Sequence, residues 1–305
     1  MPNQTLDARV KNEITEEDLE WCDIMHYSRH THLAVKFLDE MRSKHKFKII
    51  VDTDDWWEVP KDHPKYEYWR KSNVSLQIRN HLMNADAVTC THERLAEEVR
   101  PLNPNVYVIP NLIDYGKGQF RSRKMPESDK VRLLYASTIM NFSNTAIIAG
   151  AMKKLKHLPI EVVIAGHHES PLFDILVKNL TAGGDIPYRL MPWADSKSYM
   201  SKYVGDIGIL PSKPTQFNSM KSNLKVLEYA ALKMPVVVSQ ADPYLGMPVS
   251  YFNGENEFVN RVTELVENPE LRKARGESLY KWCKENYSLK STNRMDIYKQ
   301  VYDCR

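Results

Sequence analysis

Two lysines and a glutamate within FNSMKSNLKVLEYAALKMPVVVS, residues 217–239, have the types and the spacing to bind an anion. The apolar residues of this stretch recur with a helical period, and in that helix Lys221, Lys225 and Glu228 fall at i, i+4 and i+7 on one face. Lysines four residues apart repel each other, and near a helix N-terminus they also oppose the positive end of the helix dipole. The arrangement costs stability, so we expect these residues to bind a ligand.

The start of this helix supplies the remaining parts of an anion site. Ser222 is the predicted N-cap, and the amides of Asn223 and Leu224 are unpaired donors in the first turn. With the two lysines they could bind a diphosphate. Glu228, two turns into the helix, could accept hydrogen bonds from vicinal hydroxyls such as those of a ribose. The alternative is a solvated helix face with a Lys225–Glu228 ion pair, worth only about 0.3 kcal/mol.

A second group of polar and aromatic side chains follows a strand-like run at 51–57, VDTDDWW. One interpretation is a metal site, because the carboxylates of an Asp-x-Asp pair can hold a divalent ion. In a second, Trp56 and Trp57 stack on a sugar or a base. A third makes an aspartate the N-cap of a following turn and buries both tryptophans in a core.

The segment HYSRHTH, residues 26–32, lies between a strand-like run and a predicted helix. Its His26 and Arg29 could contact a phosphate or a sugar, whereas His30 and His32 are expected to cap the helix or to lie on the surface. The histidines have no partners at zinc-ligand spacing, and the four cysteines form no CxxC pair. We therefore expect no zinc site and reduced thiols.

A regular alternation of strands and helices begins at about residue 131 and would position these groups. Five short apolar runs, RLLYAS, IEVVIAG, YRLMPW, DIGILPS and PVVVS, alternate with amphipathic segments, which indicates a parallel, doubly wound sheet. Ligands of such sheets bind outside the carboxyl ends of the strands. The loops after Ser137, Gly166, Trp193 and Ser212 should therefore converge on one crevice.

The first half of the chain repeats this pattern in a shorter form. CDIMHYS, KFKIIVD, AVTC and VYVIP are predicted strands, and THLAVKFLDEMRS and THERLAEEVR are predicted helices. The polar stretch DYGKGQFRSRKMPESDK reads as a linker, and the chain after the last strand is helical with a break near Tyr287. The predicted divisions are an N-terminal domain at 1–115, a linker at 116–130 and a C-terminal domain at 131–287. A helical tail at 288–305 is predicted to pack back on the N-terminal domain.

Composition indicates an ordinary globular protein. The chain has 305 residues, 42% of them hydrophobic, which is enough to fill two medium-sized cores. It contains no apolar run of about 18 residues and no signal-peptide core, so we expect no membrane span and a cytoplasmic location. The net charge of +3 permits an anionic substrate but is far below that of a dedicated nucleic-acid binder.

The segment LPSKPTQFNSMKSNLKVLEYAALKMPVVVS resembles the nucleotide-binding segment of retaining GT-B glycosyltransferases of the family 4 type, also called glycosyl transferases group 1. In these a strand ending in Pro-Ser precedes a loop, a helix bearing Glu, and Pro-Val-Val. ADAVTCTHERLAEEV, VYVIPNLID and ENPELRKARGESLYKWCKENYSL also resemble parts of that family, so the likeness covers most of residues 20–290. It implies an α/β GT-B fold: two Rossmann-like doubly wound domains face a cleft, with a helical C-terminal tail.

The resemblance assigns roles on the donor side. Glu228 falls on the second Glu of the family's Glu-x7-Glu pair, which holds the donor ribose, whereas the first falls on Met220. The Arg and Lys that neutralise the diphosphate in the family are absent from the loop STIMNFSN. Lys221 and Lys225 are their substitutes, together with Ser222 and the following amides. Lys225→Ala is then expected to weaken donor binding while stability stays equal or improves.

Further positions follow from the same likeness. Ser137 would meet the diphosphate, and Gly166 and Trp193 would lie at the base. Relatives often carry Thr-x-His-Asp, and a subset carries Asp-x-Asp-Asp, where this chain has Asp-Thr-Asp-Asp at 52–55. Asp54 then takes the His position and Asp55 the Asp position, and either could orient the acceptor hydroxyl or the donor sugar. His26 is a third catalytic candidate, and Arg29, Trp56 and Trp57 are candidate contacts for the acceptor or the sugar.

The implied activity is that of a hexosyl- or pentosyltransferase, which moves a sugar from a nucleoside-diphosphate sugar, foremost a UDP-sugar, to a hydroxyl. It would retain configuration and need no obligatory metal or cofactor. The acceptor is a saccharide or glycan precursor, or a hydroxymethylated DNA base. The DNA alternative rests on the basic linker with Arg121, Arg123 and Lys124, and on a compact form without the family's first strand, as in a phage protein of a bacterial or virus-infected cell. The residues also leave open a sugar-nucleotide epimerase, a non-catalytic nucleotide-sugar-binding protein, and a metal-dependent Asp-x-Asp glycosyltransferase of the GT-A type.

Overall fold

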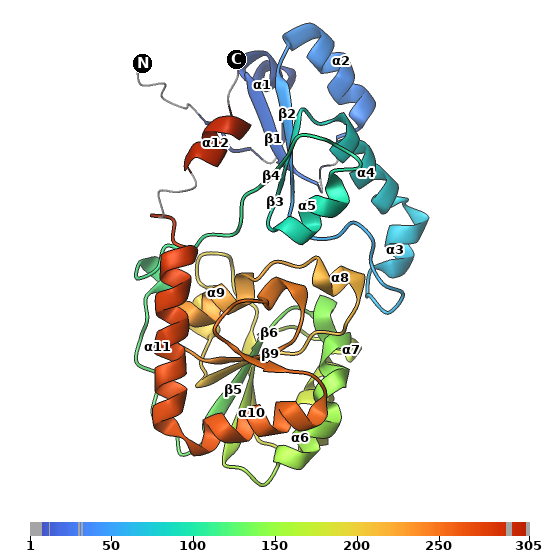
Figure 1. The fold of residues 1–305 in the computed structure, drawn as a ribbon. Coiled ribbons are helices and arrows are strands. Elements are labelled where there is room, and N and C mark those ends of the chain that lie inside the picture. Colours follow the sequence, from blue (N-terminus) through green and yellow to red (C-terminus); the bar gives the residue numbers. More distant parts are fainter. Residues whose placement is uncertain (1–7, 12, 30, 32, 291–294, 303–305) are drawn as a thin grey trace.

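The computed structural model describes residues 8–11, 13–29, 31, 33–290 and 295–302, which form two parallel-sheet units stacked one above the other (Figure 1). His30 and His32 lie outside the described residues. The N-terminal sheet has four parallel strands in the order β1-β2-β3-β4. Their bounds are β1 Ile24–Ser28, β2 Lys48–Thr53, β3 Ala87–Cys90 and β4 Val106–Val108. All four are the strands predicted from the apolar runs.

Five helices accompany this sheet in the described chain: α1 Glu16–Trp21, α2 Val35–His45, α3 Tyr66–Lys71, α4 Val74–Asn84 and α5 Glu93–Val99. The predicted α2 and α5 are present. The pair α3 and α4 was not predicted, because its sequence YEYWRKSNVSLQIRNHLMN is largely polar. Of that pair, only α4 contributes buried residues, which are Ile78, His81 and Leu82.

The C-terminal sheet has six parallel strands in the order β10-β9-β8-β5-β6-β7. The reversal between β6 and β8 on either side of β5 is the switch point at which doubly wound sheets open a crevice. Five of these strands were predicted, and the short β10 was not. Their bounds are β5 Val131–Ala136, β6 Ile160–His167, β7 Tyr188–Pro192, β8 Ile207–Leu210, β9 Val236–Ser239 and β10 Ser250–Phe252.

The helices around this sheet are α6 Ala149–Leu155, α7 Pro171–Leu180, α8 Gln216–Ser219, α9 Leu224–Ala231, α10 Glu255–Glu267 and α11 Pro269–Asn286. Two of the amphipathic segments between the predicted strands are not regular α-helices. The stretch before α6 is a 3-10 helix over Ile139–Ile148, and SKSYMSKYV forms only a 3-10 turn at Tyr199–Lys202.

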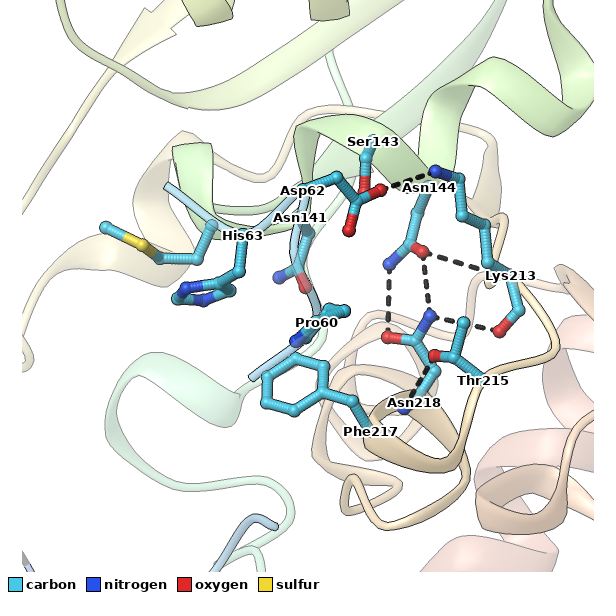
Figure 2. Close-up of a pocket in the computed structure, with 11 residues that line it drawn as sticks. Pro60, Asp62, His63, Asn141, Ser143, Asn144, Lys213, Thr215, Phe217 and Asn218 are labelled. Carbon is cyan, nitrogen blue, oxygen red and sulfur yellow. Dashed lines mark hydrogen bonds and ion pairs between the residues drawn. The ribbon is translucent and has the colours of Figure 1, made fainter. Parts of the chain in front are cut away.

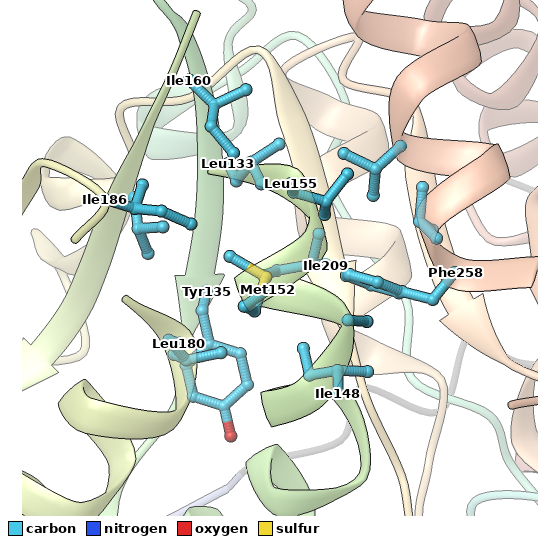
Figure 3. Close-up of a cluster of buried hydrophobic side chains, with 14 of the residues drawn as sticks. Leu133, Tyr135, Ile148, Met152, Leu155, Ile160, Leu180, Ile186, Ile209 and Phe258 are labelled. Carbon is cyan, nitrogen blue, oxygen red and sulfur yellow. The ribbon is translucent and has the colours of Figure 1, made fainter. Parts of the chain in front are cut away.

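Burial of large apolar and aromatic side chains holds the C-terminal unit together. Leu133, Tyr135, Met152, Leu155 and Phe258 belong to one continuous core formed by strands and helices (Figure 3). Each fully buried side chain of this size contributes roughly 1.5–3 kcal/mol relative to an exposed one. The core fixes β5 and β6 and thereby the loops at their carboxyl ends.

The C-terminal tail returns to the N-terminal unit, as Figure 1 shows. After α11 the chain forms α12, Met295–Val301, and the side chain of Val301 is buried with Ile50 and Ala87 of the N-terminal sheet. The described residues include no helix long and apolar enough to cross a bilayer.

Candidate functional site

A cavity of about 520 Å³ lies between the two units. Arg29, Asp55 and Trp56 line it from the N-terminal unit, and Asn141 and Lys221 line it from the C-terminal unit. These residues follow the carboxyl ends of strands in both sheets, which is where parallel sheets bind their ligands. The cavity is therefore the candidate functional site.

Lys221 presents the main positive charge of the C-terminal wall. Its Nζ donates to Oδ1 of Asn141 and lies 4.8 Å from the centroid of the Phe217 ring. Burial lowers the pKa of Lys221, and the negative charge of Asp55 partly offsets that effect. Because no carboxylate of the described residues contacts this partly buried ammonium directly, it favours an anionic ligand, which would replace the lost solvation.

The backbone next to Lys221 adds unpaired donors. Helix α9 begins at Leu224 and is preceded by Asn223 as N-cap residue, which makes no side-chain cap. The prediction of Ser222 as N-cap is therefore wrong by one residue. Within the described chain, the amide groups of Ser222, Asn223, Leu224 and Lys225 have no hydrogen-bond acceptor. Four such donors at a helix N-terminus, beside an ammonium, form a strongly electropositive position.

Lys225 points away from Lys221. Its Nζ lies 2.7 Å from Oε2 of Glu228 and 2.6 Å from the hydroxyl of Tyr203. Glu228 is 1% exposed, and its carboxylate also accepts hydrogen bonds from the hydroxyls of Tyr199 and Tyr203 at 2.8 and 3.0 Å. Since Lys221 precedes α9, the two lysines do not share a helical face, and the charge of Lys225 is compensated by Glu228. Because Lys225 compensates a buried carboxylate, the expectation that Lys225→Ala leaves stability equal or improved does not fit this geometry.

Arg29 organises the acidic loop after β2. Its guanidinium is 5% exposed and donates to the backbone carbonyls of Asp55 and Trp56. It also lies 3.5 Å from the carboxylate of Asp54 and 3.7 Å from that of Asp55. Burial and the neighbouring Asp54 raise the pKa of Asp55. The arrangement directs Asp55 into the cavity, whereas the side chain of Asp54 is 59% exposed and does not line it.

The two tryptophans differ in their surroundings. Trp56 and Trp57 pack against each other with ring centroids 3.9 Å apart, and both are buried in the N-terminal core. Only Trp56 also lines the cavity. The backbone carbonyl of Trp57 accepts hydrogen bonds from Trp69 and Ser75, which fixes it within the core. Trp57 is thus placed for packing and not for contact with a sugar, which corrects its predicted role.

His26 also differs from its predicted place. Its Nδ1 pairs at 2.7 Å with the hydroxyl of Tyr302, and the two rings meet edge to face. Burial lowers the pKa of His26. The side chain of His26 is exposed and does not line the cavity, so its contact with Tyr302 places it at the C-terminal tail and away from the predicted catalytic position.

The ends of β5 and β6 meet closely beneath the donor side of the site. Ser137 follows β5, and its hydroxyl accepts a hydrogen bond from the Asn141 side chain at 2.9 Å. Gly166 has φ +98°, and a Cβ atom there would lie 2.4 Å from the carbonyl oxygen of Ser137. The sequence placed the loop directly after Gly166, but β6 continues to His167 through a bulge. Glycine is therefore required here by the backbone itself.

Trp193 lies on the loop that follows β7. Its side chain is 65% exposed, and its amide donates to the carbonyl of His167 at 3.0 Å. The indole is free to contact a planar ligand at the carboxyl end of β6 and β7, although it does not line the cavity between the units.

The segment before α9 ties the two units together. Met220 is completely buried in the core of the N-terminal unit, and its carbonyl accepts from Nε2 of His92 at 2.9 Å. Figure 2 shows a second contact, in which Lys213 reaches Asp62 of the N-terminal unit at 2.7 Å. The position expected to carry the first glutamate of the family pair thus holds an apolar side chain that joins the two cores.

The described residues contain no group of three or more His, Cys, Asp or Glu side chains that could hold a metal ion. The two carboxylates of the Asp-x-Asp pair are engaged separately. Asp52 accepts a hydrogen bond from Thr89 at 2.6 Å, and Asp54 lies beside the cationic Arg29. A guanidinium at this position competes with a divalent ion for the carboxylate.

Several site residues were not identified from the sequence. Asn141 and His63 line the cavity, and Tyr199 and Tyr203 hold Glu228. Asn141 lies in the loop STIMNFSN, whose position after a strand was a usable signal. The tyrosines carried no such signal, because only the folded chain brings them to Glu228.

Comparisons with known proteins support the fold. No family model matches the sequence, and no curated protein matches it. Among solved structures, TarM is 13% identical with a TM-score of 0.61, and the match covers 92% of this chain and 54% of TarM. Sucrose-phosphate synthase from Thermosynechococcus elongatus is 13% identical with a TM-score of 0.62, and the match covers 93% of this chain and 74% of the synthase chain. HepE from Anabaena, in complex with UDP-glucose, is 11% identical with a TM-score of 0.66, and the match covers 94% of this chain and 80% of HepE.

These similarities define the class of the fold. The chain has two parallel-sheet domains that match GT-B glycosyltransferase structures over nearly all of its length. It spans about half the length of TarM. At 11–13% identity the likeness concerns the fold alone, and function has to be argued from the site.

Proposed function

We propose that this protein is a GT-B glycosyltransferase that moves a sugar from a nucleoside-diphosphate sugar to an acceptor hydroxyl. The observation that carries the proposal is the N-terminus of α9: in the described chain its four backbone amides without an acceptor directly follow Lys221, whose partly buried side chain lines the cavity between the units. This combination suits a diphosphate and stabilises the charge that develops on it as the sugar departs.

On the opposite wall, Asp55 is the candidate group for orienting the acceptor hydroxyl. A carboxylate with a raised pKa is a better proton acceptor near neutral pH than an ordinary aspartate. Arg29 acts through Asp55 by fixing its backbone and is a positioning residue. Asp54 and Trp56 remain candidate contacts at the edge of the acceptor side.

The nucleoside is proposed to bind towards α9 and the loops after β6 and β7. Glu228 is covered by Tyr199, so a ribose would bond to the Tyr199 hydroxyl or displace it from the carboxylate. Trp193 and the backbone near Gly166 are the candidate contacts for the base. The structure of HepE holds UDP-glucose, which makes a UDP-sugar the first donor to test.

We propose retention of configuration and no obligatory metal, since Lys221 and the α9 amides supply positive charge where a metal would otherwise bind. A saccharide is favoured over DNA as the acceptor. Within the basic linker, Arg123 donates to the backbone carbonyls of Met200 and Tyr203, so this guanidinium is engaged with its own chain.

The experiment is a thermal-shift screen of UDP-, ADP- and GDP-sugars with and without a chelator, followed by measurement of nucleotide release with candidate acceptors. One donor at about 100 times its Kd should stabilise the fold by about 2.7 kcal/mol. Release of free diphosphate that requires an acceptor would exclude an epimerase and a non-catalytic binding protein. The proposal is wrong if no nucleoside diphosphate or its sugar shifts the transition.

A further inference from the structure

The N-terminal wall of the cavity carries a cation that the donor site does not use. Lys65 lines the cavity near its exposed edge. Among the residues that the structure describes, its ammonium has no hydrogen bond and no ion pair with a carboxylate. Lys61, four residues earlier, is also exposed but does not line the cavity.

His63 lies between this cation and the donor side. Burial, then the positive charges of Lys221 and Lys65, lower the pKa of His63 to about 4, so both lysines are close to the imidazole. The amide of Lys65 donates to Nδ1 of His63 at 3.2 Å, which leaves Nε2 to carry the proton in the neutral ring. The ring also meets Phe217 edge to face at 5.5 Å, as the close packing in Figure 2 shows.

The charges that line the cavity do not balance. Arg29 is compensated by the two aspartates beside it, and Lys221 adjoins the diphosphate position at α9. His63 and His81 are neutral at pH 7, because burial lowers the pKa of each. In the described part of the chain, Lys65 is the remaining uncompensated cation on the lining.

An aromatic wall adjoins this cation. Trp69 and Tyr68 of α3 line the same side of the cavity, and the Trp69 ring lies 6.4 Å from that of His63. Aromatic faces bind the apolar face of a sugar ring, whereas Lys65 and the Nε2–H of His63 are donors suited to an anion.

We propose that the acceptor is a saccharide bearing an anionic group, a phosphate monoester or a carboxylate, which binds Lys65 and Nε2–H of His63 while its ring packs on Trp69. This subsite rests on the proposed function, because it assigns the acceptor half of the same cavity. It places the acceptor's charge on the N-terminal wall and its reacting hydroxyl towards Asp55.

The test is calorimetric titration of glucose, glucose 6-phosphate and glucuronate into protein saturated with UDP, so that the donor site is filled. Glucose 6-phosphate or glucuronate should bind at least about tenfold more tightly than glucose, as expected for a charge-assisted contact in a cavity. Whichever of the two binds more tightly identifies phosphate or carboxylate as the anion. Equal binding of all three would overturn the proposal.

Two variants localise the effect. Lys65→Ala should weaken binding of the anionic sugar about tenfold and leave the affinities for glucose and UDP unchanged. Lys61→Ala is the matched control and should change none of them. Equal losses in both variants would show a general effect of surface charge and overturn the subsite. If UDP does not bind, the proposed function fails, and the comparison of the two variants with glucose 6-phosphate is made without UDP.

Discussion

Lys225 and Glu228 form an ion pair in which the ammonium lies 2.7 Å from a carboxylate that is 1% exposed. The same carboxylate accepts hydrogen bonds from Tyr199 and Tyr203, so its charge is compensated entirely by side chains of the C-terminal domain. Glu228 is therefore both a candidate ribose contact and a structural centre that links α9 to the 3-10 turn at Tyr199–Lys202.

Lys225→Ala should lower the free energy of unfolding by about 1–2 kcal/mol, because a buried carboxylate loses its cationic partner while the lysine itself is partly exposed. Urea denaturation measures the change. Lys124→Ala, which removes a fully exposed pair with Glu127, should change stability by less than about 0.5 kcal/mol. Adding Glu228→Gln to Lys225→Ala should recover part of the loss, since no buried charge then remains. An unchanged stability of Lys225→Ala would contradict this account of the pair.

Lys221→Met should weaken UDP binding by about tenfold to a hundredfold, the effect of losing a charge-assisted contact with a diphosphate. Its stability should be equal to or above that of the parent protein, because the partly buried ammonium has no carboxylate of the described residues in direct contact and desolvation lowers its pKa. Titration calorimetry and urea denaturation measure the two quantities. Lys178→Met, at an exposed position of α7, is the control. Unchanged UDP affinity would remove Lys221 from the donor site.

The contrast between the two lysines shows what the sequence could predict. The strands were predictable because runs such as RLLYA and VVVS are apolar throughout, as buried parallel strands require. The electropositive start of α9 was also predictable, because it depends on neighbours along the chain. The environment of Glu228 was not, since Tyr199 precedes it by 29 residues and reaches it only in the folded domain.

The same reasoning applies to the acidic loop. The sequence identified VDTDDWW as a strand end with reactive side chains, and the structure brings Asp55 and Trp56 to the cavity. The sequence could not show that Trp57, unlike Trp56, lies away from the cavity. The direction of each side chain after a strand depends on the loop conformation, which the sequence pattern does not specify. The joining of the two cores by Met220 was equally invisible, because it depends on how the domains pack.

Met220→Ala should destabilise the protein by about 2–4 kcal/mol and loosen the contact between the domains, since it removes a fully buried side chain that the C-terminal domain inserts into the N-terminal core. Denaturation measures the first effect, and the radius of gyration from X-ray scattering measures the second. Met83→Ala, at a methionine that is 46% exposed, should cost less than about 0.5 kcal/mol. A compact, fully stable Met220→Ala protein would show that this contact does not hold the domains together.

The stability of the protein should depend on His63 below pH 6.5. The pKa of His63 is lowered to about 4 from an ordinary value of 6.5, so between these values the unfolded chain binds a proton that the folded protein does not. Stability therefore falls as the pH falls from about 6.5 to about 4. The ring is only partly buried, so its contribution to this decrease in the free energy of unfolding should be about 1 kcal/mol. The decrease should be smaller by that amount in His63→Gln. Urea denaturation at pH 7 and pH 5 tests it, and equal pH dependence in both proteins would contradict it.

Gly166→Ala should be among the most destabilising single changes in the C-terminal domain. Its φ of +98° strains any residue with a Cβ atom, and that atom would lie 2.4 Å from the carbonyl oxygen of Ser137, which cannot move without distorting the end of β5. Gly246→Ala separates the two effects, because Gly246 has φ +80° but nothing within 4 Å of the added atom. We expect about 1 kcal/mol for Gly246→Ala and about 3 kcal/mol for Gly166→Ala, measured by urea denaturation. If the two variants lost similar amounts of stability, the clash with Ser137 would be relieved in the folded protein. Glycine at position 166 would then be explained by its positive φ alone and not by the close approach of β5 and β6.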